Sequence, residues 1–166
     1  MTTSALADDL KRDEGFSPHA YPDPFSPLGR ELAKPLTKRV AGWAKLPGDP
    51  WSVGYGFTGP SIGPTTVITQ AQADAELQKR IQQTEAQLDK SLPWWRQLSD
   101  IRQDVFVEMV YNLGWPKFSK FKDFLSLVDQ ARFDQAADDL IMSAVAHQLP
   151  ARYKRLAALM RTGKRP

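Results

Sequence analysis

Residues 13–16 of the chain read DEGF, and residues 21–24 read YPDP. The first of these stretches ends a helix predicted over residues 4–14, because Gly15 is a natural stop at a helix C-terminus. Glu14 then lies at the negative end of the helix dipole, which favours the protonated form of its carboxyl group. A protonated Glu that faces a cleft can act as a general acid. A lone Glu before a Gly is more often a solvated helix end, so the residues that follow decide between the two interpretations.

The next part of the chain is interrupted by turn-forming residues. Residues 18–64 hold nine of the thirteen prolines and seven of the ten glycines, which favours turns and short strands over long helices. Residues 51–57, WSVGYGF, alternate large apolar residues with small ones and predict one strand with one buried face. The small residues on its other face would let a ligand approach the backbone closely. Residues 28–34 predict one or two helical turns that end before Pro35.

The remainder of the chain predicts helices. Thr69 is a good N-cap for a long helix over about residues 69–90, whose narrow apolar stripe suits a link between two lobes. The fold class is therefore α+β and mostly α, with a cleft between the lobes that suits an extended substrate. The other helices are expected over residues 100–114, within 118–128, over 133–144 and from Pro150 onward, of which the first is apolar enough to be the centre of a bundle.

The composition describes one ordinary globular domain. Of the 166 residues, 42% are hydrophobic and 25% are charged, which allows a sizeable core. The absence of cysteine excludes disulfides, thiolate metal sites and cysteine nucleophiles. His19 and His147 are far apart and lack the spacing of metal ligands, so neither a metal nor another cofactor is expected. The polar N-terminus lacks the apolar run of a signal peptide, and no stretch predicts a membrane span.

Positive charge gathers at the C-terminal end of the chain. The net charge is only +3, but no acidic residue follows Asp139. This pattern favours a polyanionic partner such as an anionic membrane surface or a cell-wall polymer, and a solvated helix face explains it equally well. Nucleic acid is not expected, because Tyr153 is the only aromatic residue among the basic ones. The six basic residues are Arg152, Lys154, Arg155, Arg161, Lys164 and Arg165.

Three side chains suit the hydrolysis of a sugar polymer. Glu14 is followed nine positions later by Asp23, and the predicted strand carries the hydroxyl of Ser52. Glycoside hydrolysis needs one protonated carboxyl group for the leaving oxygen and one carboxylate for the attacking water. A nearby hydroxyl can hold that water. Asp49 is a rival for the second carboxylate, although an Asp in Gly-Asp-Pro is usually a turn residue.

With these residues identified, the chain resembles the phage-type lysozymes of glycoside hydrolase family 24 over residues 5–23 and 51–166. Each motif is weak alone, but the motifs occur in order and with nearly constant spacing. The exception is a stretch between Asp23 and Ser52, where residues 24–50 form an insertion that a fold can tolerate. The motifs are Asp-Glu-Gly at 13–15, Tyr-x-Asp at 21–23, Ser-x-Gly-x-Gly at 52–56, Ile-Thr at 68–69, Asn-Leu-Gly at 112–114, Pro-x-Arg-x-Lys-Arg at 150–155 and Arg-Thr-Gly at 161–163.

The resemblance implies a lysozyme-like fold in one catalytic domain over residues 1–166. A small lobe over residues 15–66 would contain the β-structure and the insertion, and the long helix would join it to a helical lobe. That lobe would comprise residues 93–166 together with the first helix. The implied reaction is hydrolysis of the β-1,4 bond between N-acetylmuramic acid and N-acetylglucosamine in bacterial peptidoglycan. The resemblance thus implies a bacteriolytic muramidase of phage type, which we expect to be a monomer.

The resemblance also implies roles for the three candidate side chains. Glu14 would be the general acid, and Asp23 would be the carboxylate that supports the attacking water. Ser52 would help to place that water, at a position where the family usually has Thr. Asp23 is preferred to Asp49 because its spacing from Glu14 matches the family. Direct attack by water predicts inversion at the sugar, with the two carboxyl groups about 6.5–9.5 Å apart.

Further positions match the family outside these three residues. Tyr111 and Asn112 would line the cleft from the helical lobe. Phe57 stands at a substrate-binding position that is usually His, and its effect on the choice of substrate is open. The ion pairs expected to join the first helix to the last are Arg152 with Glu14 and Arg155 with Asp13.

Two other functions stay open from the sequence. A lytic transglycosylase would cut the same bond with one Glu and form an anhydro product, although Asp23 and Ser52 argue against this mechanism. A non-catalytic protein would bind the wall or anionic outer-membrane lipid through the basic C-terminal helix, with Lys164 and Arg165 free beyond Gly163. The expected location is the host bacterial cytoplasm until release to the periplasm and cell wall, or alternatively the virion.

Overall fold

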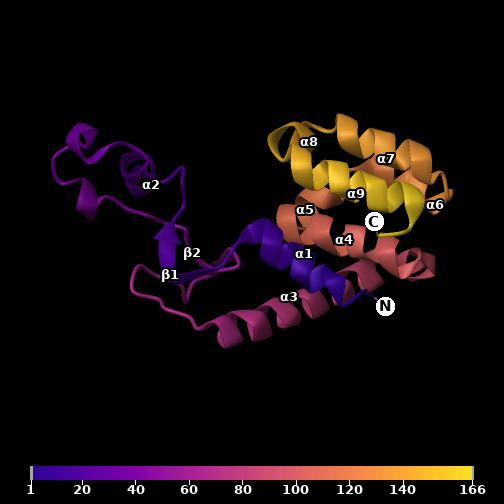
Figure 1. Cartoon of the computed structure of the whole chain (residues 1–166), viewed down its shortest axis with the longest axis horizontal. Coiled ribbons are helices and arrows are strands. Elements are labelled where there is room, and N and C mark those ends of the chain that lie inside the picture. Colours follow the sequence, from indigo (N-terminus) through magenta and orange to yellow (C-terminus); the bar gives the residue numbers. More distant parts are fainter. Residues whose placement is uncertain (1, 166) are drawn as a thin grey trace. The chain divides into compact units, whose positions relative to one another are not determined.

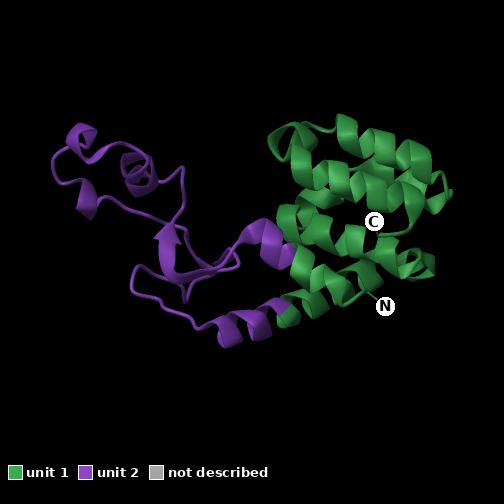
Figure 2. Cartoon of the chain, in the orientation of Figure 1, with its two compact units in different colours: residues 1–9, 78–166 green, residues 10–77 purple. Residues whose placement is uncertain are grey.

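A computed structural model describes residues 2–165 of the chain. Most of these residues are helical (Figure 1). Three short strands form a sheet in the N-terminal part. The predicted α+β, mostly α fold class is confirmed. The chain divides into two compact units: unit 1 comprises residues 1–9 and 78–166, and unit 2 comprises residues 10–77 (Figure 2). Both boundaries fall inside helices, unlike those of the predicted lobes, and the cleft between lobes stays a prediction.

Helix α1, Ala5–Glu14, begins and ends close to its predicted positions. Leu6 and Leu10 are four residues apart, so they share one face of the helix, and both are buried. Gly15 ends the helix with a positive φ of 68°, and its N–H donates to a carbonyl of the last turn at 3.0 Å. The predicted position of Glu14 at the C-terminus of a helix is therefore confirmed.

The sheet is antiparallel, with strands in the order β1, β2, β3. In β1, Ser17–Pro22, and β2, Trp51–Gly54, Tyr21 lies opposite Ser52. The register shifts between Ser17 and Tyr21, so β1 is irregular over its middle residues. The third strand is β3, Phe57–Thr58, which pairs with β2 alone.

The single strand predicted over residues 51–57 is wrong. The chain reverses after β2 and forms a hairpin, so Val53 lies opposite Phe57. Gly54 and Gly56 have φ values of 65° and 75°, in the left-handed region that favours glycine. The small residues that suggested one face of a strand therefore mark a tight turn.

The 24–50 segment, which is the predicted insertion, contains helix α2, Pro27–Leu32, and two short 3₁₀ helices at Leu36–Lys38 and Trp43–Lys45. The α2 helix agrees with the helical turns expected in this part of the chain. Its N-cap is Ser26, whose hydroxyl accepts a hydrogen bond from the Gly29 N–H at 3.0 Å. The segment is thus a folded piece of unit 2.

Hydrogen bonds close the 24–50 segment at its base. The N–H of Asp23 donates to the Gly48 carbonyl at 3.1 Å and to the Pro50 carbonyl at 2.9 Å. The N–H of Leu28 donates to the Pro47 carbonyl at 3.0 Å. The two ends of the segment are therefore joined where β1 ends and β2 begins.

Helix α3, Gln70–Ser91, confirms the long predicted helix. The Thr69 hydroxyl accepts from the Gln72 N–H at 3.2 Å, and the Gln72 side chain accepts from the Thr69 N–H at 2.9 Å. This reciprocal arrangement is a capping box, which satisfies N–H groups that the first turn leaves unpaired. The predicted stripe is buried at Ala73, Leu77, Ile81 and Leu88.

Unit 1 is a helical bundle around α4, Asp100–Leu113. Eight consecutive residues of this helix are buried, which confirms its predicted central place. Phe106 packs against the rings of Phe118 and Phe124, and each such aromatic pair adds about 0.5–1.5 kcal/mol beyond burial. The unit also contains a 3₁₀ helix at Pro93–Gln97. Its other α-helices are α5 (Trp115–Phe118), α6 (Lys122–Asp129), α7 (Phe133–Met142), α8 (Ala144–Gln148) and α9 (Pro150–Thr162).

The last helix, α9, packs on α4 and α7 within unit 1. Its apolar stripe, Leu156, Leu159 and Met160, is buried as predicted. Pro150 occupies the first turn, and Gly163 ends the helix with a φ of 63°. Among the helices of residues 2–165, none is long and apolar enough to cross a membrane.

Candidate active site

Glu14 lies at the end of α1 and is half-buried. The β2–β3 turn lies beside it, because a Cβ atom added to Gly56 would be 3.5 Å from Glu14 Oε2. A φ of 75° also favours glycine at this position. The turn that carries Gly56 therefore approaches the predicted general acid.

Ser52 lies in β2, the middle strand of the sheet, and is half-buried. Its Cα partners are Tyr21 on β1 and Thr58 on β3. Since Asp23 directly follows β1, this register brings Ser52 to the end of the sheet where Asp23 begins the next segment. The sheet thus places the predicted hydroxyl and the predicted second carboxylate near each other within unit 2.

Asp23 is held by its own backbone and by its neighbours. Its N–H donates to two carbonyls at the far end of the 24–50 segment, and its Oδ1 accepts from the Phe25 N–H at 2.7 Å. This side-chain bond is an Asx turn, which orients the carboxylate. A Cβ atom at Gly29 would lie 2.0 Å from the Asp23 carbonyl oxygen, so only glycine fits there. The carboxylate is half-buried at the base of the segment.

Asp49, the rival carboxylate, belongs to the same small region. It lies between Gly48 and Pro50, whose carbonyls both accept from the Asp23 N–H. Asp49 is exposed, whereas Asp23 is half-buried. The structure therefore brings both carboxylates to the base of the 24–50 segment, and the preference for Asp23 stays a prediction.

A polar network that the sequence did not reveal joins the end of α1 to the hairpin. Tyr55 is buried, and its hydroxyl donates to Asp74 Oδ1 at 2.7 Å. Lys11 Nζ lies 2.9 Å from the same oxygen. Lys11 precedes Glu14 by three residues, so the two side chains are neighbours on the helix surface. The network therefore fixes the last turn of α1 against the hairpin and the first turns of α3.

The charges of this network follow from its hydrogen bonds. The hydrogen bond from Lys11, followed by the one from Tyr55, lowers the pKa of the Asp74 carboxyl group. Burial, followed by the hydrogen bond to Asp74, raises the pKa of the Tyr55 hydroxyl. Asp74 is therefore an ionised acceptor at neutral pH, with a cation and a neutral phenol as its donors. No local pattern could have found this contact, because 19 positions separate Tyr55 from Asp74.

Phe57, predicted as a substrate-binding residue, is a core residue of unit 2. Its side chain is only 1% exposed, and its ring packs edge-on against Tyr55 at 6.0 Å. A Cβ atom on Gly54 would lie 2.7 Å from this ring, so the glycine makes room for it. The burial of Phe57 argues against direct contact between its ring and a ligand, and Thr58 is the exposed residue of this strand.

Tyr111 and Asn112, the other predicted substrate-binding residues, lie in the last turn of α4 in unit 1 and are half-buried. Within residues 2–165, Asn112 Oδ1 is buried and has no hydrogen-bond partner. A buried acceptor without a partner costs free energy, and native proteins satisfy most such groups. This oxygen is therefore an acceptor whose hydrogen-bonding capacity is unused within the described residues.

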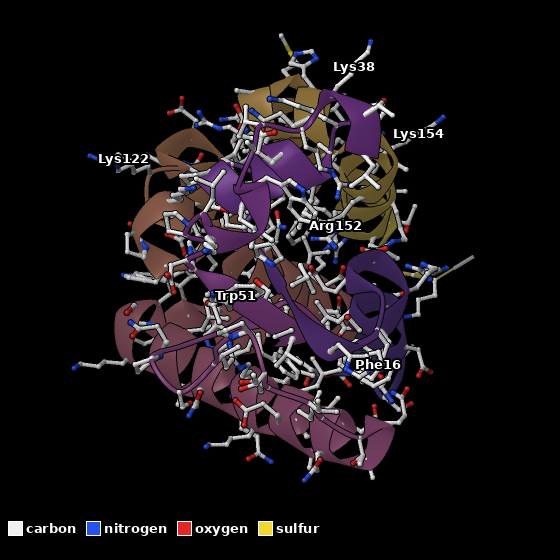
Figure 3. All side chains as sticks on the ribbon, turned by 90° about the vertical axis from the view of Figure 1, so that its left-hand side faces the viewer. Phe16, Lys38, Trp51, Lys122, Arg152 and Lys154 are labelled. Atoms are coloured by element: carbon white, nitrogen blue, oxygen red, sulfur yellow. The ribbon has the colours of Figure 1, made fainter. Side chains whose placement is uncertain are left out.

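The three supporting residues have partners that only the structure reveals. Arg155 makes a bidentate pair with Glu108, at 2.9 and 2.8 Å, and lies 3.3 Å from Asp9. Asp13 lies 3.5 Å from Arg12. Arg152 is half-buried on α9, and Figure 3 labels its side chain. The predicted pairs of Arg155 with Asp13 and of Arg152 with Glu14 stay predictions.

The expectation that Arg165 is free beyond the last helix is wrong. Its guanidinium pairs with Asp104 at 2.8 Å and with Asp9 within unit 1. Asp104 is fully buried, and burying an unpaired carboxylate is costly. The positive charge of Arg165 compensates the negative charge of this carboxylate. Lys164 is exposed as expected.

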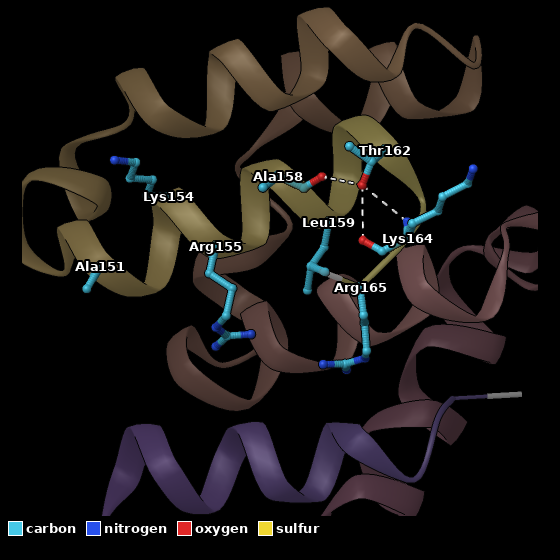
Figure 4. Close-up of a pocket in the computed structure, with 8 residues that line it drawn as sticks. All are labelled: Ala151, Lys154, Arg155, Ala158, Leu159, Thr162, Lys164 and Arg165. Atoms are coloured by element: carbon cyan, nitrogen blue, oxygen red, sulfur yellow. Dashed lines mark hydrogen bonds between the residues drawn. The ribbon is translucent and has the colours of Figure 1, made fainter.

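A groove of about 550 Å³ runs beside α9 in unit 1 (Figure 4). In this view the side chains of Lys154 and Arg155 leave the helix in different directions. None of the three predicted catalytic residues contributes to the groove, whereas the predicted supporting residue Arg155 does. Its lining consists of Ala151, Lys154, Arg155, Ala158, Leu159, Thr162, Lys164 and Arg165.

Comparisons with known proteins agree with the resemblance found in the sequence. A family model described as phage lysozyme matches residues 37–161 of the chain. A protein of Dictyostelium discoideum named "Probable T4-type lysozyme 1" is 23% identical over 163 residues, which cover 96% of this chain and 95% of that protein. The family match contains Ser52 and Asn112, whereas Glu14 and Asp23 precede it. No group of three or more potential metal ligands occurs among residues 2–165.

Proposed function

Because the chain belongs to the phage lysozyme family, we propose that it hydrolyses the β-1,4 bond between N-acetylmuramic acid and N-acetylglucosamine in bacterial peptidoglycan. The observation that carries this proposal is the position of Glu14, which is half-buried at a helix end beside the Gly56 turn. The hairpin that brings the turn to Glu14 also contains Ser52. The acid and the hydroxyl that hydrolysis needs thus belong to one folded unit.

In the proposed reaction Glu14 donates its proton to the glycosidic oxygen as the bond to the anomeric carbon breaks. A water molecule attacks that carbon from the opposite face and gives its proton to Asp23. The Ser52 hydroxyl holds the water in place, and the Asx turn at Phe25 keeps the Asp23 carboxylate oriented. The sugar is released with inverted configuration, because water attacks directly without a covalent intermediate.

Substrate binding in this proposal includes Tyr111 and Asn112 at the end of α4. The unpartnered Oδ1 of Asn112 supports this role, because the amide and hydroxyl groups of an N-acetyl sugar are donors for such an acceptor. A hydrogen bond from the substrate to this oxygen would remove the free-energy cost of an unsatisfied buried acceptor.

The proposed function is tested with Glu14→Gln on purified Gram-negative peptidoglycan, following loss of turbidity and identifying products by mass spectrometry. Glutamine keeps the shape of the side chain but cannot donate the acidic proton. We expect turnover to fall about 100- to 10,000-fold with the fold intact. Glu76→Gln, in the same unit, is the control and should keep wild-type turnover.

The products separate the rival functions in the same experiment. Reducing ends are expected from the wild-type chain, because water enters the cleaved bond. Anhydro ends would indicate a transglycosylase instead of a hydrolase. Binding to the wall without turnover by the wild-type chain would overturn the enzymatic proposal altogether.

A further inference from the structure

Exposed apolar side chains gather on the 24–50 segment. Phe25 is 78% exposed and Leu36 is 68% exposed, although large apolar side chains usually find cover in a folded unit. Leu32 and Val40 are exposed as well. All four belong to one short segment of unit 2, which therefore exposes several large apolar side chains to solvent.

The same segment is strongly basic. It contains five basic and two acidic residues, so its net charge of +3 equals that of the whole chain. Of the two acidic residues, Glu31 is buried and bonded to Lys34, which leaves Asp49 as the exposed one. The exposed basic residues of the segment are Arg30, Lys34, Lys38 and Lys45.

Internal bonds hold the 24–50 segment in a fixed conformation. The Glu31 carboxylate accepts from Lys34 Nζ and from the Val40 N–H, and the bond to Lys34 followed by the bond to Val40 lowers its pKa. Arg39 donates to the Lys34 and Leu32 carbonyls at 3.1 Å. The guanidinium of Arg39 also lies over the Trp43 ring at 4.4 Å, which is a cation–π contact. The apolar and basic side chains are therefore displayed on a structured scaffold, from which Lys38 extends in Figure 3.

The basic C-terminal end is less available for a partner than its sequence suggests. Arg155 and Arg165 are paired with buried carboxylates, and Arg161 pairs with Asp138. Lys154 and Lys164 are the exposed lysines of this end. Cationic side chains combine with exposed apolar ones on the 24–50 segment, whereas most of the C-terminal arginines stabilise unit 1.

We propose that the 24–50 segment binds the surface of an anionic phospholipid membrane. Phe25, Leu32, Leu36 and Val40 enter the boundary between headgroups and acyl chains, and the basic residues contact the phosphates. Leu32, Leu36 and Val40 are aliphatic, and such side chains favour lipid over a glycan or nucleic acid, which are instead bound by stacked aromatic rings and hydrogen bonds. The inference goes beyond the proposed function, because membrane binding needs neither Glu14 nor Asp23.

Two pairs of matched variants test this site by binding to phosphatidylglycerol–phosphatidylcholine vesicles at low ionic strength. The charge pair is Lys38→Gln/Lys45→Gln on the segment and Lys154→Gln/Lys164→Gln on unit 1, which remove equal charge from exposed positions. The apolar pair is Leu36→Ser on the segment and Met142→Ser on unit 1. Met142 is 79% exposed, so both substitutions remove an apolar side chain from water-exposed positions.

We expect the loss of two segment lysines to weaken vesicle binding about thirtyfold, since each lysine near an anionic surface contributes about fivefold. Leu36→Ser should weaken binding about tenfold through lost apolar contact. Both unit 1 controls should keep wild-type affinity. High salt should remove most of the charge-dependent binding, and pure phosphatidylcholine vesicles should bind weakly.

Several outcomes would overturn the proposal. Equal losses in the segment and unit 1 variants would mean that charge alone matters, and equal binding to both kinds of vesicle would mean that no anionic site exists. Loss of binding to purified peptidoglycan sacculi, with vesicle binding unchanged, would assign the segment to the wall polymer. Circular dichroism confirms that each variant is folded, and turnover on soluble glycan fragments should stay at the wild-type level, which separates this proposal from the catalytic one.

Discussion

At the scale of single residues, hydrogen bonds around Asp23 order the candidate site. Asp23 is fixed by backbone hydrogen bonds to the end of the 24–50 segment and by the Asx turn at Phe25. Asp49 lies in the same region but is exposed. The sequence could name both carboxylates, because turn chemistry is local. It could not show that both carboxylates lie at the base of the 24–50 segment, because the hydrogen bonds that close this base join residues far apart in sequence.

The two carboxylates can be distinguished by Asp23→Asn and Asp49→Asn. Asparagine keeps an oxygen that can accept from the Phe25 N–H, so Asp23→Asn should fold normally. It cannot accept the proton of the attacking water, so we expect turnover on peptidoglycan to fall about 100-fold or more. Asp49→Asn should stay close to wild type. A large loss in Asp49→Asn with an active Asp23→Asn would reverse the assignment.

At the scale of secondary-structure elements, the helix ends were predictable and the hairpin was not. Gly15, Thr69 and Pro150 are local start and stop signals, and each acts where the sequence predicts. The hairpin was missed because glycines at every second position also fit one face of a strand. Their positive φ values, rather than their small size, are what the β2–β3 turn requires.

The role of this turn can be tested by Gly56→Ala, with Gly42→Ala as its control. Both glycines have a φ of 75°, so each substitution should lower the free energy of unfolding by about 1–2 kcal/mol. Only the Cβ at position 56 would meet a neighbour, Glu14 Oε2. We therefore expect kcat to fall in Gly56→Ala alone, as measured by steady-state kinetics beside thermal unfolding. Equal kinetics in the two variants would show that the turn does not position Glu14.

At the scale of the whole molecule, long-range ion pairs give the C-terminal arginines a structural role that the sequence did not reveal. The Arg155–Glu108 and Arg165–Asp104 pairs join residues 47 and 61 positions apart. A charge count could not identify these partners, so the C-terminal end looked like a free basic surface. Since the removal of one partner from a buried pair costs about 3–5 kcal/mol, these arginines have a clear structural role. At this end Lys154 and Lys164 remain exposed, and the 24–50 segment exposes Arg30, Lys34, Lys38 and Lys45.

The central claim is that water attacks the sugar directly, with Glu14 as acid and Asp23 as the supporting carboxylate. The most direct measurement is the anomeric configuration of the newly formed reducing end, followed by NMR during the first turnovers, before mutarotation mixes the anomers. Direct attack predicts the α anomer, because the β-linked sugar is inverted in one displacement. A first product with the β configuration would require a covalent or substrate-assisted intermediate and would contradict the account.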